Sequence, residues 1–159
     1  MARMKTLLAV ACLVAMGYAN LATATCIIDD PGYWVSNEGG CEDVATGLVW
    51  GDSMGATLGG FGDWDFFLWS CSEKVVEEGT TVYDDWRAPT VNELYQAALN
   101  GLGYYVPHGD PLTNVHRWTG SDRGNKAWVV RLRDADEILI NKNSAINGIC
   151  VRDPNAPPD

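Results

Sequence analysis

Four cysteines lie beyond the first 24 residues of this chain, and their pairing limits the folds that it can adopt. They are Cys26, Cys41, Cys71 and Cys150. Four cysteines allow three pairings. Turn-forming residues occupy positions 29–32 and 37–40, so we favour a Cys26–Cys41 bridge across a short hairpin. The other two cysteines would then close a loop of about 80 residues, which contributes roughly 4–5 kcal/mol of stability in a chain-entropy treatment.

The first 24 residues have the features of a secretory signal peptide. Arg3 and Lys5 give a positively charged start, an apolar run follows over residues 7–16, and residues 22–24 are Ala-Thr-Ala. The run is too short to cross a bilayer, and small residues of this kind precede a cleavage site. We therefore expect a mature chain that starts at Thr25 and is secreted, periplasmic or displayed at the cell surface. A retained membrane anchor is one alternative.

A lipid anchor at Cys26 is the other alternative to simple export. Thr25 is a poor residue before an acylated cysteine, and lipid at Cys26 would leave Cys41 without its partner. No later stretch is long or apolar enough to form a transmembrane helix, so we expect no membrane span in the mature chain.

The charge of the mature chain excludes several classes of partner. Cleavage after residue 24 of 159 leaves 135 residues, the size of one domain. The leader holds two of the 11 basic residues and none of the 21 acidic ones, so the net charge becomes −12. A chain this acidic disfavours nucleic acid, anionic membranes and sulfated polymers as partners. All seven tryptophans lie in the mature chain, which indicates a large core, an aromatic binding surface or both.

The hydrophobic pattern predicts a strand followed by a first helix. Residues 47–50 form a short apolar run typical of a strand, and the glycine-rich stretch 51–62 predicts a loop. Asp63 is the expected N-cap and Gly79 the expected C-terminal stop. One face of the expected helix carries Trp64, Phe67, Leu68, Cys71 and Val75.

A second helix is predicted after Pro89. Thr90 and Glu93 have the spacing of a capping box, in which each side chain accepts from a free backbone N–H group of the other residue. An Asn-Gly pair at 100–101 predicts the end of this helix. Its expected apolar stripe consists of Val91, Leu94, Tyr95 and Ala98.

The last third of the chain reads as a long irregular segment and an antiparallel meander. Residues 102–117 contain two prolines and two glycines, which favour a loop. Strands are then expected around residues 128–132, 137–142 and 149–151. In the first of these, Trp128, Val130 and Leu132 alternate with Val129, Arg131 and Arg133, which predicts one apolar and one charged face.

These elements predict an α+β fold in which two helices pack on one side of a twisted antiparallel sheet. The expected organisation is a signal peptide over residues 1–24, a single domain over residues 25–153 and a proline-rich, disordered tail over residues 154–159.

Several short motifs, in order, resemble one known family. Thr46 begins a Thr-Gly-Leu-Val-Trp run, residues 85–94 read Asp-Trp-Arg-Ala-Pro-Thr-Val-Asn-Glu-Leu, and 118–121 read Trp-Thr-Gly-Ser. Residues 127–130 and 150–152 read Ala-Trp-Val-Val and Cys-Val-Arg. Together they are similar to the C-terminal domain of Legionella collagen-like protein (Lcl).

The resemblance to the Lcl C-terminal domain family implies a fold and a role. It implies a C-type-lectin-like fold and an exported bacterial module for carbohydrate binding or adhesion. Cys71 lies where the family has a helix cysteine, which supports its pairing with Cys150. The chain departs from the family at Ala88, where leucine is usual, and at Ile149, where arginine is common.

The long Asp-Trp-Arg motif is interpreted as structural. We expect Trp86 to fill the core and Arg87 to bind Glu93 through two parallel hydrogen bonds. The full set of residues expected to have structural roles is Trp50, Trp86, Arg87, Pro89, Thr90, Glu93, Trp118 and Trp128.

Catalytic and metal patterns are weak in this sequence. Ser53 lies in a Gly-x-Ser-x-Gly run, but a nucleophile elbow needs a strand, a turn and a helix in a larger sheet. His108 and His116 lack a third ligand in a recognised zinc pattern. The acidic clusters at 63–65 and 134–137 do not have EF-hand spacing, so we expect no cofactor, with calcium as the alternative.

A recognition surface is predicted in the segment after the second helix. Aromatic rings beside polar, turn-forming residues suit a sugar or a protein loop. An ordinary solvated hairpin tip is the alternative. The candidate residues are Tyr104, Tyr105, His108, Arg117, Ser121, Asp122, Arg123, Asn125 and Lys126.

The sequence therefore predicts an exported binding or adhesion module without catalytic activity. Its ligand is expected to be a neutral glycan or an extracellular protein. A structural subunit of a cell-surface assembly, and hence an oligomer, is a second hypothesis. A third is an enzyme of the formylglycine-generating type, a class that shares the C-type-lectin-like fold and needs reactive cysteines.

Overall fold

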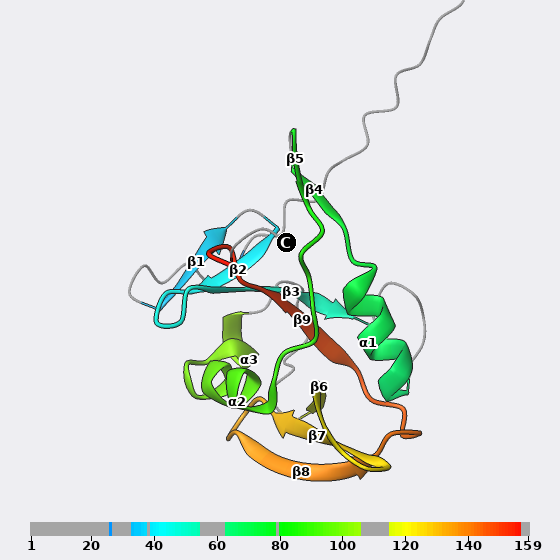
Figure 1. Cartoon of the computed structure of the whole chain (residues 1–159). Coiled ribbons are helices and arrows are strands. Elements are labelled where there is room, and N and C mark those ends of the chain that lie inside the picture. The colour runs from blue at the N-terminus through cyan, green and yellow to red at the C-terminus, as the bar shows by residue number, and fades with distance from the viewer. Residues whose placement is uncertain are drawn as a thin grey trace, which may run out of the picture.

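The computed structural model describes Cys26 and residues 33–37, 39–54, 63–78, 80–105 and 115–156. Within these residues the fold is α+β, as predicted: a sheet of seven strands, a separate two-stranded ribbon and three helices (Figure 1). The signal peptide predicted over residues 1–24 lies outside the described residues, as do His108 and residues 157–159 of the predicted tail.

The large sheet has the order β1-β2-β3-β9-β6-β7-β8. Its strands are β1 Trp34–Asn37, β2 Gly40–Asp43, β3 Leu48–Met54, β6 His116–Arg123, β7 Lys126–Arg131, β8 Asp136–Asn141 and β9 Gly148–Arg152. The ribbon consists of β4 Val76–Glu78 and β5 Thr81–Tyr83, and the helices are α1 Trp64–Ser72, α2 Val91–Leu99 and α3 Leu102–Tyr105. Neighbouring strands are antiparallel except β6 and β9, which pair in parallel. The C-terminal strand β9 therefore lies in the middle of the sheet.

A disulfide ties the N-terminal hairpin, as predicted. Strands β1 and β2 pair from Trp34 opposite Asp43 to Asn37 opposite Gly40. Cys26 is bonded to Cys41 on β2, with their Cα atoms 5.4 Å apart. This bond holds Cys26 against β2, the neighbour of the edge strand β1.

The helices lie on opposite faces of the sheet, so the prediction that they share one side is wrong. On β9, Ile149 and Val151 belong to the apolar cluster beneath α2, whereas Cys150 between them belongs to the cluster beneath α1. Successive strand residues point to opposite faces. Figure 1 shows α1 and α2 on either side of β9.

Strand β7 is also buried on both faces, because an apolar cluster lies on each side of the sheet. Val130 packs into the α2 cluster and Val129 into the α1 cluster, and neither is exposed. The prediction that Val129 shares a charged outer face is therefore wrong. A helix on each side turns an alternating pattern into a continuous apolar one.

Helix α1 begins as predicted and ends early. Asp63 is its N-cap, and Oδ1 accepts a hydrogen bond from the Phe66 N–H group at 2.9 Å. The helix ends at Ser72 with Glu73 as the C-cap, so the prediction of an end near Gly79 is wrong. Val75 lies beyond the helix and is exposed, because the chain turns there to enter β4.

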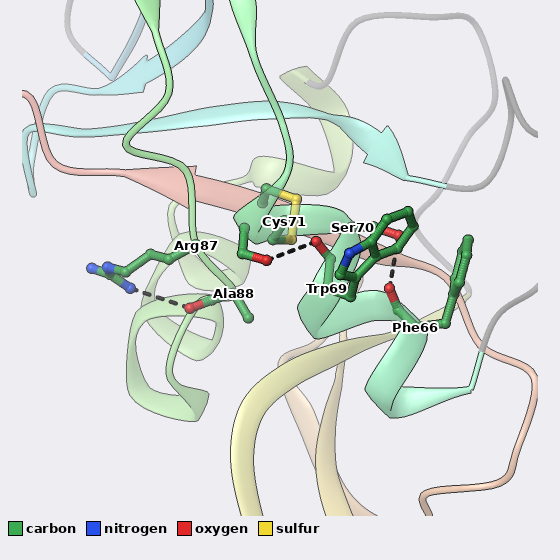
Figure 2. Close-up of a disulfide and its surroundings, with 8 residues drawn as sticks. Phe66, Trp69, Ser70, Cys71, Arg87 and Ala88 are labelled. Carbon is green, nitrogen blue, oxygen red and sulfur yellow. Dashed lines mark hydrogen bonds between the residues drawn. A yellow bond between two sulfur atoms is a disulfide. The ribbon is translucent and has the colours of Figure 1, made fainter.

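The second disulfide joins α1 to the central strand. Cys71 on α1 is bonded to Cys150 on β9, with their Cα atoms 5.5 Å apart, and both residues are fully buried (Figure 2). This confirms the predicted pairing. Close packing accompanies the bond, because a Cβ atom at Gly148 would overlap the ring of Phe67.

Helix α2 has the predicted capping box. Thr90 Oγ1 accepts from the Glu93 N–H group at 3.2 Å, and the Glu93 carboxylate accepts from the Thr90 N–H group at 2.7 Å. The buried stripe is Leu94, Ala97 and Ala98. Tyr95, predicted in that stripe, is 37% exposed, because it lies one position outside the face that meets the sheet.

Two predicted loops contain regular structure. Strand β3 continues through residues 51–54, where a glycine-rich loop was expected. Helix α3 and the start of β6 occupy both ends of the predicted irregular segment 102–117. The remaining parts of both segments, 55–62 and 106–114, lie outside the described residues.

Candidate functional site

Five residues of the predicted recognition surface come together on the β6–β7 hairpin. They are Ser121, Asp122, Arg123, Asn125 and Lys126. The chain reverses at Gly124, whose φ of +65° suits glycine. All except Ser121 are exposed. The structure therefore offers a polar hairpin tip at this position.

Two residues of that hairpin, Ser121 and Asp122, form contacts that stabilise the fold. Ser121 Oγ accepts a hydrogen bond from the first N–H group of α2, at Val91, at 2.9 Å. The Asp122 carboxylate forms an ion pair with Lys142 at 2.6 Å, and the ammonium group of Lys142 also lies 3.9 Å from the ring centre of Trp64. Arg123, Asn125 and Lys126 are left to face solvent.

The other predicted surface residues lie elsewhere. Arg117 is only 1% exposed, so its prediction as a surface residue is wrong: it lies on β6, between β9 and β7 in the interior of the sheet. Tyr104 is 61% exposed but belongs to α3, which lies well away from the β6–β7 turn in Figure 1. The backbone of Tyr105 continues α3, and His108 lies outside the described residues.

The Asp-Trp-Arg motif packs as predicted. Trp86 is 3% exposed. The Arg87 guanidinium donates to both carboxylate oxygens of Glu93, at 2.9 and 2.7 Å. Hydrogen bonding to Glu93 raises the pKa of Arg87. Burial alone would raise the pKa of Glu93, but hydrogen bonds from Arg87 and Thr90 outweigh it and lower that pKa.

The remaining residues predicted to be structural also occupy packed positions. Trp50 and Trp118 are buried, one in each apolar cluster, and Trp128 is half-buried. Pro89 is buried, and its carbonyl accepts a hydrogen bond from Gly120 at 2.7 Å. These contacts join the segment before α2 to strand β6.

The weak catalytic and metal patterns have ordinary structural roles where they are described. Ser53 lies within β3, with its backbone opposite Ile149. Asp63 caps α1, and Asp134 pairs with Arg131 at 2.7 Å, a hydrogen bond that lowers the pKa of Asp134. The Nε2 atom of His116 lies 3.7 Å from Asp136. In the part of the chain that the structure describes, no three acidic, histidine or cysteine side chains group as a metal site would require.

Sequence reasoning missed an open hollow beside the last strand. Its volume is about 810 Å³. One wall consists of residues 82–87, from β5 onward, and the other consists of Arg152 at the end of β9 and residues just after it. Two backbone hydrogen bonds of 2.9 Å between Arg87 and Val151 join these walls. The hollow is lined by Val82, Tyr83, Asp84, Asp85, Trp86, Arg87, Arg152, Asp153, Pro154 and Ala156.

Charges of both signs line this hollow next to aromatic rings. The Arg152 guanidinium lies 4.2 Å from the ring centre of Tyr83, a cation–π contact that fixes its position. Asp84 and Asp85 are exposed, and neither forms an ion pair or a side-chain hydrogen bond with the rest of the described chain. Their carboxylates are free to accept hydrogen bonds from a ligand.

The wall of the hollow also holds polar atoms that the protein does not use. The hydroxyl of Tyr83 and the indole N–H group of Trp86 are buried without a hydrogen-bond partner among the described residues. Leaving such a group unpaired costs about 1–3 kcal/mol. No local sequence pattern predicts this site, because its two walls are more than sixty residues apart in the sequence.

Comparison with known proteins finds no family model, no curated protein and no solved structure that matches this chain. Within the described ranges, none of the helices combines the length and apolar character needed to cross a membrane.

Proposed function

We propose that this protein is an exported, non-catalytic binding module that recognises a neutral glycan in the hollow beside β9. We assign the protein to the C-type-lectin-like fold and to the family of the Lcl C-terminal domain. The ordered series of short motifs supports that assignment. The two disulfides support export, since such bonds persist in oxidising compartments.

The observation that carries the proposal is the mixed chemistry of the hollow. Sugar hydroxyls both donate and accept hydrogen bonds, so they suit a wall that offers carboxylates and guanidinium groups together. Three carboxylates, Asp84, Asp85 and Asp153, outnumber the two guanidinium groups of Arg87 and Arg152. A sulfated or phosphorylated ligand would meet repulsion there, whereas a neutral glycan would not.

The cysteines support a binding role over the enzymatic hypothesis. A formylglycine-generating type of enzyme needs reactive thiols, and all four described cysteines are engaged in disulfides. The hypotheses of a ligand site on the β6–β7 hairpin and of a subunit in a surface assembly remain predictions.

A glycan screen with the mature chain and two variants tests the proposal. The variant Asp84→Asn/Asp85→Asn removes two exposed charges from the hollow without touching the core. One hydrogen bond to a charged group contributes about 1.5–3 kcal/mol, so binding of neutral glycans should weaken tenfold or more.

The control variant is Asp122→Asn/Lys126→Gln, which changes the hairpin tip by the same number of exposed charges and should bind as the wild type does. Loss of binding in the hairpin variant alone would move the site to the predicted recognition surface. Binding restricted to sulfated chains would refute the proposal.

A further inference from the structure

Helix α1 exposes a pair of aromatic rings on its outer side. Trp69 is 57% exposed and Phe66 is 41% exposed, and their ring centres are 5.8 Å apart. Figure 2 shows the two rings together on α1, away from the Cys71–Cys150 bond. Exposed tryptophan is the kind of residue that dominates the binding energy of protein interfaces.

Two carboxylates flank this aromatic pair. Asp65 and Glu73 are exposed, and their side chains form no ion pair or hydrogen bond with the described residues. The spacing of residues 65, 66, 69, 72 and 73 places all of them on one side of the helix. This outer stripe of α1 consists of Asp65, Phe66, Trp69, Ser72 and Glu73.

The position of Glu73 is electrostatically unfavourable for the protein alone. Glu73 is the C-cap of α1, and no basic residue lies in the last turn. The C-terminal end of a helix carries partial negative charge, so a carboxylate there is destabilising by about 0.3–1 kcal/mol. The carboxylate and the helix end together create a field that attracts a cation.

We propose that the outer stripe of α1 docks a basic peptide segment of a partner protein, one in which arginine or lysine alternates with apolar residues. An arginine would stack on Trp69 and pair with Glu73, a second cation would pair with Asp65, and an apolar side chain would cover Phe66. A second copy of this chain fits poorly, because each copy carries a net charge of −10. This surface is independent of the proposed glycan site.

Calorimetric titration with two synthetic peptides tests the proposal. One peptide alternates arginine with leucine, and the other has glutamate in place of each arginine. The arginine peptide should bind and the glutamate peptide should not. Trp69→Ala should weaken binding at least tenfold, and Glu73→Gln about threefold, with the second effect fading at high salt. Circular dichroism checks that both variants keep the wild-type fold.

Matched variants separate this surface from other causes of binding. Tyr104→Ala removes an equally exposed ring on α3 and should leave peptide binding unchanged, as should Asp84→Asn/Asp85→Asn. Peptide binding that survives Trp69→Ala would mean attraction to the overall negative charge and would overturn the proposal.

Two further results would also overturn it. The first is displacement of the arginine peptide by neutral oligosaccharides from the wild type and from Glu73→Gln but not from Trp69→Ala. That result would assign the two rings to a glycan. Self-association in sedimentation experiments that disappears in Trp69→Ala would assign them to a second copy of the chain.

Discussion

Helices α1 and α2 have the same length, nine residues each, but differ in what holds them against the sheet. Helix α2 starts with a complete capping box, supported by the Arg87–Glu93 pair, and buries a regular stripe of Leu94, Ala97 and Ala98. Helix α1 has one capping side chain, Asp63. A disulfide then fastens it to the central strand.

This difference shows how a covalent bond frees the outer side of a helix. Helix α2 shows in its local sequence where it begins and which side is buried. Helix α1 carries aromatic residues on both sides: Trp64 and Phe67 face the sheet, and Phe66 and Trp69 face solvent. With Cys71 bonded to Cys150, the orientation of α1 does not depend on a simple division between apolar and polar sides.

Removal of the α1 disulfide should have the largest effect on stability. Cys71→Ala/Cys150→Ala should lower the free energy of unfolding by about 4.5 kcal/mol, since the bond closes a long loop. Cys26→Ala/Cys41→Ala, which opens a much shorter loop, should cost about 3 kcal/mol. Urea unfolding of both variants measures the difference, and a greater loss for the shorter loop would contradict the comparison.

The contact between α1 and β9 should be the next most sensitive feature. In Gly148→Ala the new methyl group would overlap the Phe67 ring. Such overpacking typically costs about 1–3 kcal/mol. Gly120→Ala on β6 is the matched control, because the atom nearest to its added methyl group is Ala88 Cβ at 3.2 Å. Thermal denaturation should show a smaller loss of stability for this variant. Equal losses of stability in the two variants would mean that α1 can shift away from β9 at little cost.

The smallest effect is expected at the cap of α2, and it depends on pH. The pKa of Glu93 is lowered in the folded protein, so its contribution is complete above the unfolded pKa of about 4.3 and is lost as the pH falls through the lower folded value. Glu93→Gln should cost about 0.5–1 kcal/mol at pH 7, because the Arg87 side chain is 44% exposed.

Unfolding curves of wild type and Glu93→Gln at pH 7 and pH 3 check this sign. The two proteins should approach one another in stability at the lower pH. A difference that grows on acidification would contradict the stabilising role given to the Glu93 carboxylate.

Sequence reasoning succeeded where the signal is local or covalent. The Thr90–Glu93 box, the Asp63 cap and both disulfides follow from short spacings, motif resemblance and the chemistry of cysteine. The Arg87–Glu93 pair follows from guanidinium and carboxylate geometry six residues apart across a cap.

The failures occurred where distant segments decide the outcome. The burial of Val129 depends on a second helix covering the sheet, and the end of α1 depends on the turn into β4 rather than on Gly79. Arg117 looked like a surface residue because its strand was taken for a loop. The hollow was missed because Asp84 and Asp153 line the same hollow only after Arg87 pairs with Val151 on β9.

Amide hydrogen exchange of α1 and α2 in Cys71→Ala/Cys150→Ala, compared with the wild type, tests most directly the claim that the disulfide orients α1 while α2 is held by its own sequence. Under conditions where circular dichroism shows the variant folded, amides of residues 66–72 should lose protection, and those of residues 94–99 should keep it. Equal loss in both helices, or unchanged protection of α1, would contradict the account.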